Sequence, residues 1–237
     1  MAYLKQTKRS ASIRLRPEGT PASPVEGQIY FNSTTKVAYV YSSSFWNQMN
    51  AQFLGSGGIM STYDSGGSTY IVHTFLNSGI FLASAGDVDY LVVAGGGGGG
   101  GNYGSYGDGG GGAGGFRSAT GLSVTAQSYA VTVGAGGAGG IAPSRVGSDG
   151  NDSIFSSITS TSGGGGGAHD PNNNGRTGGS GGGATRTGSV GAGNTPSTSP
   201  SQGNNGGTGS TRAGGGGGGN GAVGANASSG QGGVGGA

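Results

Sequence analysis

Few side chains in this sequence could perform acid–base or nucleophilic chemistry. The two histidines are His73 and His169, and the two glutamates, Glu18 and Glu26, both lie near the N-terminus. This placement argues against the paired carboxylates of a glycosidase. No serine lies in a predicted strand-to-helix nucleophile elbow, His73 lies in a predicted strand, and His169 precedes Asp170 in a predicted surface turn. We therefore predict that the protein is not an enzyme and has no catalytic, cofactor-binding or metal site.

Nucleotide-binding and thiol chemistry find no support either. The G-x-G-x-x-G pattern recurs by chance in a chain with this much glycine, and none of its copies precedes the helix that a dinucleotide-binding turn requires. The chain has no cysteine, which excludes disulfides and thiolate metal sites. We expect no cofactor.

Two polar insertions in the glycine-rich part of the chain carry side chains suited to recognition instead. Aromatic, amide and arginine groups on rigid loops suit saccharide or protein binding. The alternative is that both insertions are solvated loops without a ligand. The candidate receptor-binding residues are Tyr103, Tyr106 and Asp108 in the first insertion, and His169, Asp170, Asn172, Asn173, Asn174 and Arg176 in the second.

The composition limits how such loops can be held. Glycine accounts for 63 of 237 residues, and 8% of residues are charged, whereas glycine averages about 7% in proteins. Apolar residues make up 31%, well below the roughly 45–50% of a globular domain. A conventional core of packed side chains is therefore excluded over most of the chain.

The N-terminal residues are basic and then rich in proline. Five cations precede the first acidic residue, but no aromatic stacking platform or recognition helix accompanies them, so we expect a docking or solvated arm and no nucleic acid. No run is long and apolar enough to cross a bilayer, and no secretory signal is apparent. We expect a protein made in a cytoplasm, without membrane insertion. The cations are Lys5, Lys8, Arg9, Arg14 and Arg16.

Composition divides the chain into four segments. Residues 1–26 form an extended basic arm, because proline fixes φ and removes a hydrogen-bond donor. Residues 27–54 contain two strand signals around the turn Asn32–Thr35, with a third short strand after them, and predict a small hairpin module. Residues 55–69 are predicted to be a Gly/Ser linker. Residues 70–237 are predicted to be a glycine-rich domain nucleated by β-strands.

The glycine tracts are predicted to be ordered, although a lone glycine strand in water stays disordered because of its backbone entropy. They alternate with strands such as Asp89–Ala94 and Tyr129–Val133. Without a Cβ, neighbouring segments can form three-residue-per-turn helices that bond to one another laterally. The alternative is a flexible tail. We expect a mainly β fold with extensive polyglycine II-like packing and essentially no α-helix.

Two stretches resemble parts of phage appendages. Gly27–Asn32, followed by Tyr39–Tyr41 and Phe45-Trp46, resembles a hairpin near the start of tailed-phage fibre proteins. Val88–Gly101 and Tyr129–Gly140 resemble the glycine-rich, polyglycine II-type domain of phage tail fibres and adhesins. The resemblance implies attachment to the particle through Tyr30, Phe31, Tyr39, Tyr41, Phe45 and Trp46, and receptor contact through the loops between glycine tracts.

We therefore expect a structural virion component, a fibre or appendage protein that contacts other phage structural proteins of the tail or capsid. Its glycine-rich domain is expected to reach a host cell-surface receptor, either a glycan or an outer-membrane protein. Because fibres are commonly threefold and a small sheet is marginal alone, a homotrimer is expected. The alternatives are a decoration protein with a purely architectural role, a non-viral extracellular glycine-rich protein, and a fibre-borne glycan depolymerase.

Overall fold

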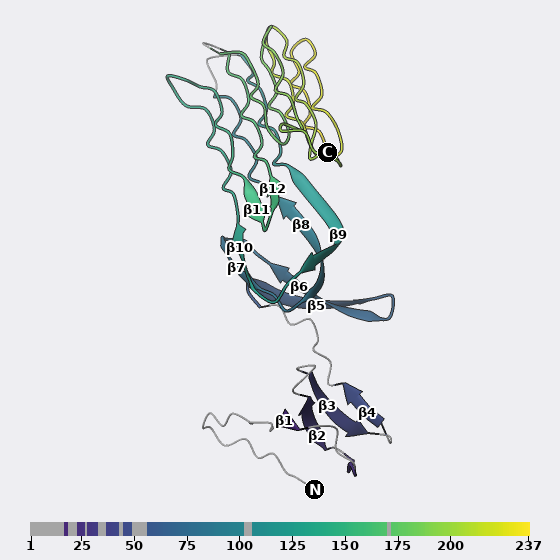
Figure 1. Cartoon of the computed structure of the whole chain (residues 1–237). Coiled ribbons are helices and arrows are strands. Elements are labelled where there is room, and N and C mark those ends of the chain that lie inside the picture. The colour runs from purple at the N-terminus through teal and green to yellow at the C-terminus, as the bar shows by residue number, and fades with distance from the viewer. Residues whose placement is uncertain are drawn as a thin grey trace. The chain divides into compact units, whose positions relative to one another are not determined.

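The computed structural model describes residues 17–18, 23–26, 28–32, 37–42, 45–48, 56–101, 106–169 and 172–237. The chain divides into two compact units, Met1–Leu54 and Gly55–Ala237. Within the described residues the regular elements are strands, and no helix is present (Figure 1). The same residues accordingly contain no helix capable of crossing a membrane.

The first unit is a four-stranded sheet in the order β1-β2-β3-β4. The strand β1 pairs in parallel with β2, and the other neighbours are antiparallel. The predicted hairpin and its third strand are therefore present, and the aromatic positions occupy neighbouring registers: Tyr30 pairs with Tyr39, and Tyr41 with Trp46. Phe31 lies in β2 and Phe45 in β4. The strands are β1 (Pro17–Glu18), β2 (Ile29–Asn32), β3 (Val37–Ser42) and β4 (Phe45–Gln48).

The second unit begins with strands that form three separate sheets. A four-stranded antiparallel sheet has the order β12-β11-β10-β7, and β5-β6 and β8-β9 are two-stranded. The strands are β5 (Ile59–Ser65), β6 (Ser68–Thr74), β7 (Gly79–Leu82), β8 (Gly86–Val93), β9 (Phe116–Val124), β10 (Ser128–Thr132), β11 (Ser153–Phe155) and β12 (Ile158–Ser160).

The strand β5 lies inside the segment that the sequence predicts to be a linker. Its sequence contains Ile59 and Tyr63, which favour strands, and it pairs with β6 along its whole length. Gly66 and Gly67 connect the two strands with φ values of 59° and 79°. A type I′ hairpin turn requires positive φ at both central residues. The glycine pair that suggested flexibility is therefore a tight turn.

A small apolar core lies among these strands. Phe81, Val92, Val124 and Ile158 are buried, and the Phe81 ring lies 5.9 Å from the Phe155 ring, centroid to centroid, with the rings inclined at 67°. Few apolar side chains contribute, as the composition requires. The core anchors the ends of the glycine segments that continue from β8, β10 and β12.

Those glycine segments form a lattice in which backbone bonds to backbone, drawn in Figure 1 as parallel undulating segments beyond β11 and β12. The segment 95–101 shows the geometry. The N–H groups of Gly95, Gly98 and Gly101 donate to the carbonyls of Asn151, Ser148 and Arg145 on one neighbour. The N–H groups of Gly97 and Gly100 donate to the carbonyls of Gly112 and Gly109 on another. The carbonyls of Gly96 and Gly99 accept from the N–H groups of Gly137 and Gly140 on a third.

Bonds to the same neighbour recur every third residue, and the residues between them bond to other segments, which is the signature of side-by-side helices with three residues per turn. The prediction of polyglycine II-like packing is confirmed by this network. Because most of these bonds have an N···O distance between 2.8 and 3.0 Å, the segments approach as closely as strands of a sheet do. Their stability comes from many lateral bonds rather than from buried side chains.

The position of a segment in the lattice explains its sequence. In the central tract Gly163–Gly167, a Cβ at any position would overlap a neighbouring backbone atom. In the edge segment 134–140 a side chain is sterically excluded only at every third position. A Cβ at Gly134, Gly137 or Gly140 would overlap a carbonyl oxygen. At Gly136 and Gly139 the nearest carbonyl oxygens would lie 3.7 and 3.9 Å away, and the intervening residues are the exposed Ala135 and Ala138.

The junction between strands and lattice is held by a buried amide. Gln202 is fully buried. Its Oε1 accepts a hydrogen bond from the backbone N–H of Thr161 at 2.8 Å, and its Nε2 donates to the carbonyl of Pro196 at 2.9 Å. Its own carbonyl accepts from the N–H of Phe116, at the start of β9. Through its side chain and its backbone, this one residue thus joins its own segment to two others that are distant in sequence, at Phe116 and Thr161.

Candidate functional site

The up-and-down course of the glycine segments places alternate connections at the same end of the lattice. Consecutive segments pair antiparallel: the N–H of Gly97 bonds to Gly112, and the N–H of Gly100 to Gly109. The connections that follow residues 101, 140, 167, 185 and 209 therefore meet at the end away from the strands (Figure 1). We call this end the apical face. Both polar insertions singled out in the sequence begin there.

The two insertions contact each other. The rings of Tyr106 and His169 stack with centroids 3.9 Å apart and an interplanar angle of 12°. The backbone N–H of His169 donates to Oδ1 of Asp108 at 2.8 Å. Tyr106, Asp108 and His169 therefore form one cluster, although 61 residues separate Asp108 from His169. Tyr103 and Asp170 lie outside the described residues.

Asp108 is the half-buried acid of this cluster. Burial raises the pKa of its carboxyl above the ordinary value, against the opposing effects of the His169 N–H and the nearby charges of His169 and Arg145. Ionisation of Asp108 is therefore less favourable here than in water, while its oxygen still organises the loop. The carboxylate is a structural acceptor for the connection that carries His169.

The asparagines of the second insertion bond mainly to the lattice. The carbonyl of Asn172 accepts from the N–H of Ala168, the carbonyl of Asn173 accepts from the N–H of Thr185 at 2.8 Å, and Oδ1 of Asn174 accepts from the N–H of Ser189. Asn172 and Asn174 are exposed and Asn173 is half-buried. These residues hold the connection in place beside the Tyr106–His169 stack.

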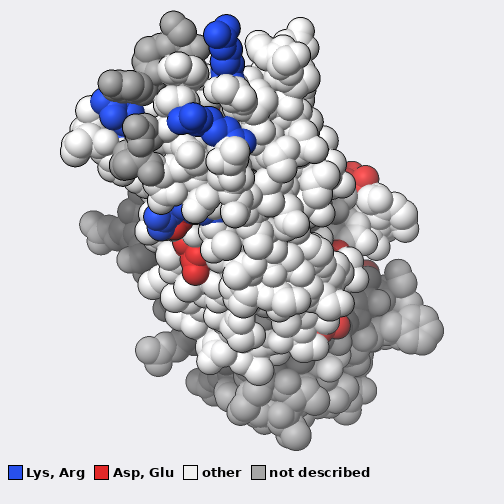
Figure 2. Space-filling view, turned by 90° about the horizontal axis from the view of Figure 1, so that it is seen from above, with Lys and Arg blue, Asp and Glu red and all other residues white. Residues whose placement is uncertain are grey.

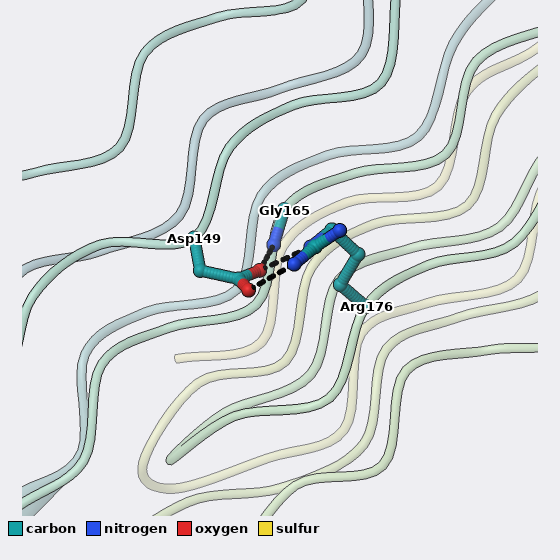
Figure 3. A network of polar contacts seen from close by, with 3 residues as sticks. All are labelled: Asp149, Gly165 and Arg176. Atoms are coloured by element: carbon teal, nitrogen blue, oxygen red, sulfur yellow. Dashed lines mark hydrogen bonds and ion pairs between the residues drawn. The ribbon is translucent and has the colours of Figure 1, made fainter.

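Arg176 stands apart from that stack and pairs with an acid on a neighbouring segment (Figure 3). Its Nε and Nη2 donate to the two carboxylate oxygens of Asp149 at 2.7 and 2.6 Å, and Oδ1 of Asp149 also accepts from the N–H of Gly165 at 2.9 Å. Burial acts to raise the pKa of Asp149, but the Arg176 guanidinium and the Gly165 N–H outweigh it and lower that pKa. The pair clamps three glycine segments together.

This clamp predicts a modest, acid-sensitive contribution to stability. Because the folded-state pKa of Asp149 is lowered, its stabilisation is present above the unfolded value of about 3.9 and is lost as pH falls below it. The Asp149→Asn variant keeps an acceptor for Gly165 but loses the ion pair. We expect it to lower the free energy of unfolding at pH 7 by about 0.5–1 kcal/mol, with the difference from wild type vanishing near pH 2. Denaturant titrations at both pH values measure this, and an equal loss at both contradicts the clamp.

The apical face also carries cations that sequence reasoning did not single out. Figure 2, which looks onto this face from above, shows basic side chains gathered on it, and every Lys or Arg residue after Lys36 is an arginine. The carbonyls of Arg145 and Arg212 accept from the N–H groups of Gly101 and Gly107, and Arg186 follows Thr185, whose hydroxyl donates to the carbonyl of Ala168 at 3.1 Å. The alternation of the segments is the signal that could have found them, since it assigns every second connection to one end.

Within the described residues, no three His, Cys, Asp or Glu side chains are grouped as metal ligands. The arrangement offers an aromatic face, hydrogen-bonding amides and cations on a rigid support, which is chemistry for binding.

Comparison with protein families matches a model described as a glycine-rich domain to residues 73–237. This match covers more than half of the chain. The chain belongs to the glycine-rich domain family. The family match begins in β6 and includes the whole lattice, so the glycine-rich domain comprises both the strand base from β7 onward and the apical face. No curated protein and no solved structure matches the chain.

Proposed function

We propose that this protein is a structural, non-enzymatic component of a phage particle, a fibre or appendage protein whose glycine-rich domain binds the host cell surface. One observation carries the proposal: the lattice brings Tyr106, Asp108 and His169 together on one rigid end, away from the strands. Polar and aromatic side chains on connections that a rigid scaffold supports are typical of binding surfaces. The resemblance of the tracts to those of phage adhesins supports the same function.

In this proposal the N-terminal unit attaches the chain to the tail or capsid. The aromatic positions Tyr30, Tyr39, Tyr41 and Trp46 pair across β2, β3 and β4. The unit Met1–Leu54, with its one four-stranded sheet, is small for independent stability. This small size favours a role in contact with another structural protein. The protein would be made in the host cytoplasm and built into the virion there.

We further propose that the assembled protein is a homotrimer. The β5-β6 hairpin leaves Ile59, Met60 and Tyr63 each more than half exposed, and exposed apolar groups of this kind mark protein contacts. Ile59 and Tyr63 lie on one face of β5 by strand alternation, and copies of the same chain, related by a closed symmetry, would cover both. A solution mass equal to one chain, measured by light scattering, contradicts the trimer.

Replacement of residues 102–106 by a Gly-Ser sequence of equal length tests receptor binding. We expect at least a tenfold slower adsorption of particles to the host, because the Tyr106 ring and its connection are removed while Asp108 and the lattice remain. Adsorption is counted as unattached infectious particles over time, and mass spectrometry confirms that the variant chain is incorporated. The matched control replaces the exposed turn Ser228–Gly230 in the same way. Unchanged adsorption would favour the purely architectural alternative.

A further inference from the structure

The Tyr106–His169 stack is a platform that is partly exposed. The His169 ring covers one face of the Tyr106 ring at 3.9 Å, yet Tyr106 remains 38% exposed. Stacking on His169 and the bond from the His169 N–H to Asp108 hold the ring in one orientation. A fixed aromatic ring of this kind offers a large apolar surface at little entropic cost on binding.

Cations surround this platform on the neighbouring connections. The carbonyl of Arg212 accepts from the N–H of Gly107 at 3.0 Å, next to Tyr106 in the chain. Arg186 lies on the connection whose Thr185 hydroxyl bonds to the residue preceding His169. Arg186 and Arg212 are exposed, and the one ion pair found within the described ranges joins Arg176 to Asp149 instead.

The acids at this end are fewer than the cations. Within the described residues, the apical connections hold Arg145, Arg186 and Arg212 against one acid, Asp108. Asp108 is half-buried and already accepts the His169 N–H, while Asp170 lies outside the described residues. The exposed charges that a ligand can contact are therefore the positive charges of Arg186 and Arg212. Guanidinium groups bind carboxylate and phosphate groups with two parallel hydrogen bonds.

We infer that the apical face binds an acidic saccharide, with a sugar ring against the exposed part of Tyr106 and its carboxylate or phosphate on Arg186 and Arg212. This inference rests on the proposed host-binding function and names its ligand class. A neutral saccharide would use the ring but leave both guanidinium groups without a partner. The combination of a rigid aromatic ring and flanking arginines is what selects an acidic sugar.

The test measures binding of the full-length protein to oligosaccharides that differ only in charge. The probes are oligogalacturonate, sialyllactose and a phosphorylated lipopolysaccharide core oligosaccharide, each paired with its methyl-esterified or dephosphorylated form. Titrations followed by nuclear magnetic resonance give the Kd. We expect at least one acidic probe to bind and its neutral form to bind about tenfold more weakly, the loss of one charge-assisted interaction. Binding of none, or equal binding of both forms, overturns the inference.

Variants locate the binding surface. We expect Tyr106→Ala and the double variant Arg186→Gln/Arg212→Gln each to weaken binding of the acidic probe about tenfold. Arg117→Gln, which removes one positive charge from β9 at the strand end, should leave the Kd unchanged. Equal losses in all three variants would place binding elsewhere or make it a response to net charge, and would overturn the inference. If the 102–106 replacement abolishes adsorption while no acidic probe binds, the host-binding function stands and the acidic-saccharide inference fails.

Discussion

The Gly98→Ala variant is expected to lose about 2–3 kcal/mol of unfolding free energy, through one added methyl group. Gly98 is buried, and a Cβ there would overlap the carbonyl oxygen of Ala138 on the adjacent segment. The obstacle is backbone, which cannot rotate away as a side chain can, so the segment 134–140 must move and its bonds from Gly137 and Gly140 must lengthen. Overpacking of a rigid interior carries a cost of this size. For a unit of this length it corresponds to a fall in Tm on the order of 5–10 °C.

The neighbouring residue supplies the matched control. A Cβ at Gly99 would find its nearest atom, the carbonyl oxygen of Gly109, 3.8 Å away, and neither glycine has a positive φ. Gly99→Ala should therefore keep or slightly raise the Tm, because alanine restricts the unfolded chain more than glycine does. Both variants are compared by calorimetry. If Gly98→Ala and Gly99→Ala unfold at the same temperature as wild type, the segments are not packed as closely as the hydrogen-bond network requires.

This pair of residues also shows how far the sequence alone can predict the lattice. A tract such as Gly95–Gly101 interrupted by strands predicts ordered backbone packing, because flexible linkers do not alternate with strands in this way. The same tract cannot show that Gly98 faces a carbonyl and Gly99 faces open space. That difference depends on which segments become neighbours, and residues of identical chemistry carry no information about it.

The edge segments are more informative, because side chains are retained where space allows. In residues 134–140 the alanines fall every third residue, and in residues 232–237 Val234 and Ala237 do the same. At the C-terminal edge a Cβ at Gly233 or Gly236 would overlap a carbonyl oxygen of a neighbouring segment, whereas Gly232 and Gly235 have room. A period of three in the non-glycine residues therefore marks an edge of the lattice, and an unbroken tract marks its interior.

The sequence was enough to predict which residues belong to the candidate site, but not how they come together in space. Tyr106 and His169 stand out because aromatic and polar side chains are rare in this part of the chain. Their stacking depends on the alternation of segments, which also brings Arg186 and Arg212 to the same end. The sequence predicted a linker where the structure has a hairpin with its turn at Gly66-Gly67. The reason is related: two adjacent glycines are equally typical of a flexible linker and of a type I′ turn.

Replacement of Gln202 tests the junction on which the whole arrangement depends. Lattice bonds are individually weak, so the strands must fix the ends of the segments, and Gln202 is the polar group that joins them. Gln202→Leu has a similar volume but offers no partner to the N–H of Thr161 or the carbonyl of Pro196, which its amide now satisfies. A buried backbone group left unsatisfied costs about 1–3 kcal/mol, and these two bonds are only partly buried, so we expect a loss of about 2 kcal/mol.

That loss should spread beyond the site of the change. In amide hydrogen exchange, we expect faster exchange at Thr161 and Phe116 and in the lattice segments that follow them, because these segments lose their fixed ends together. The control is Gln231→Leu, since Gln231 is exposed and bonds through its backbone to Ser228; it should change neither stability nor exchange. If Gln202→Leu altered exchange at Thr161 alone, the lattice would be stable without its strand base, and lateral backbone bonding would suffice to order it.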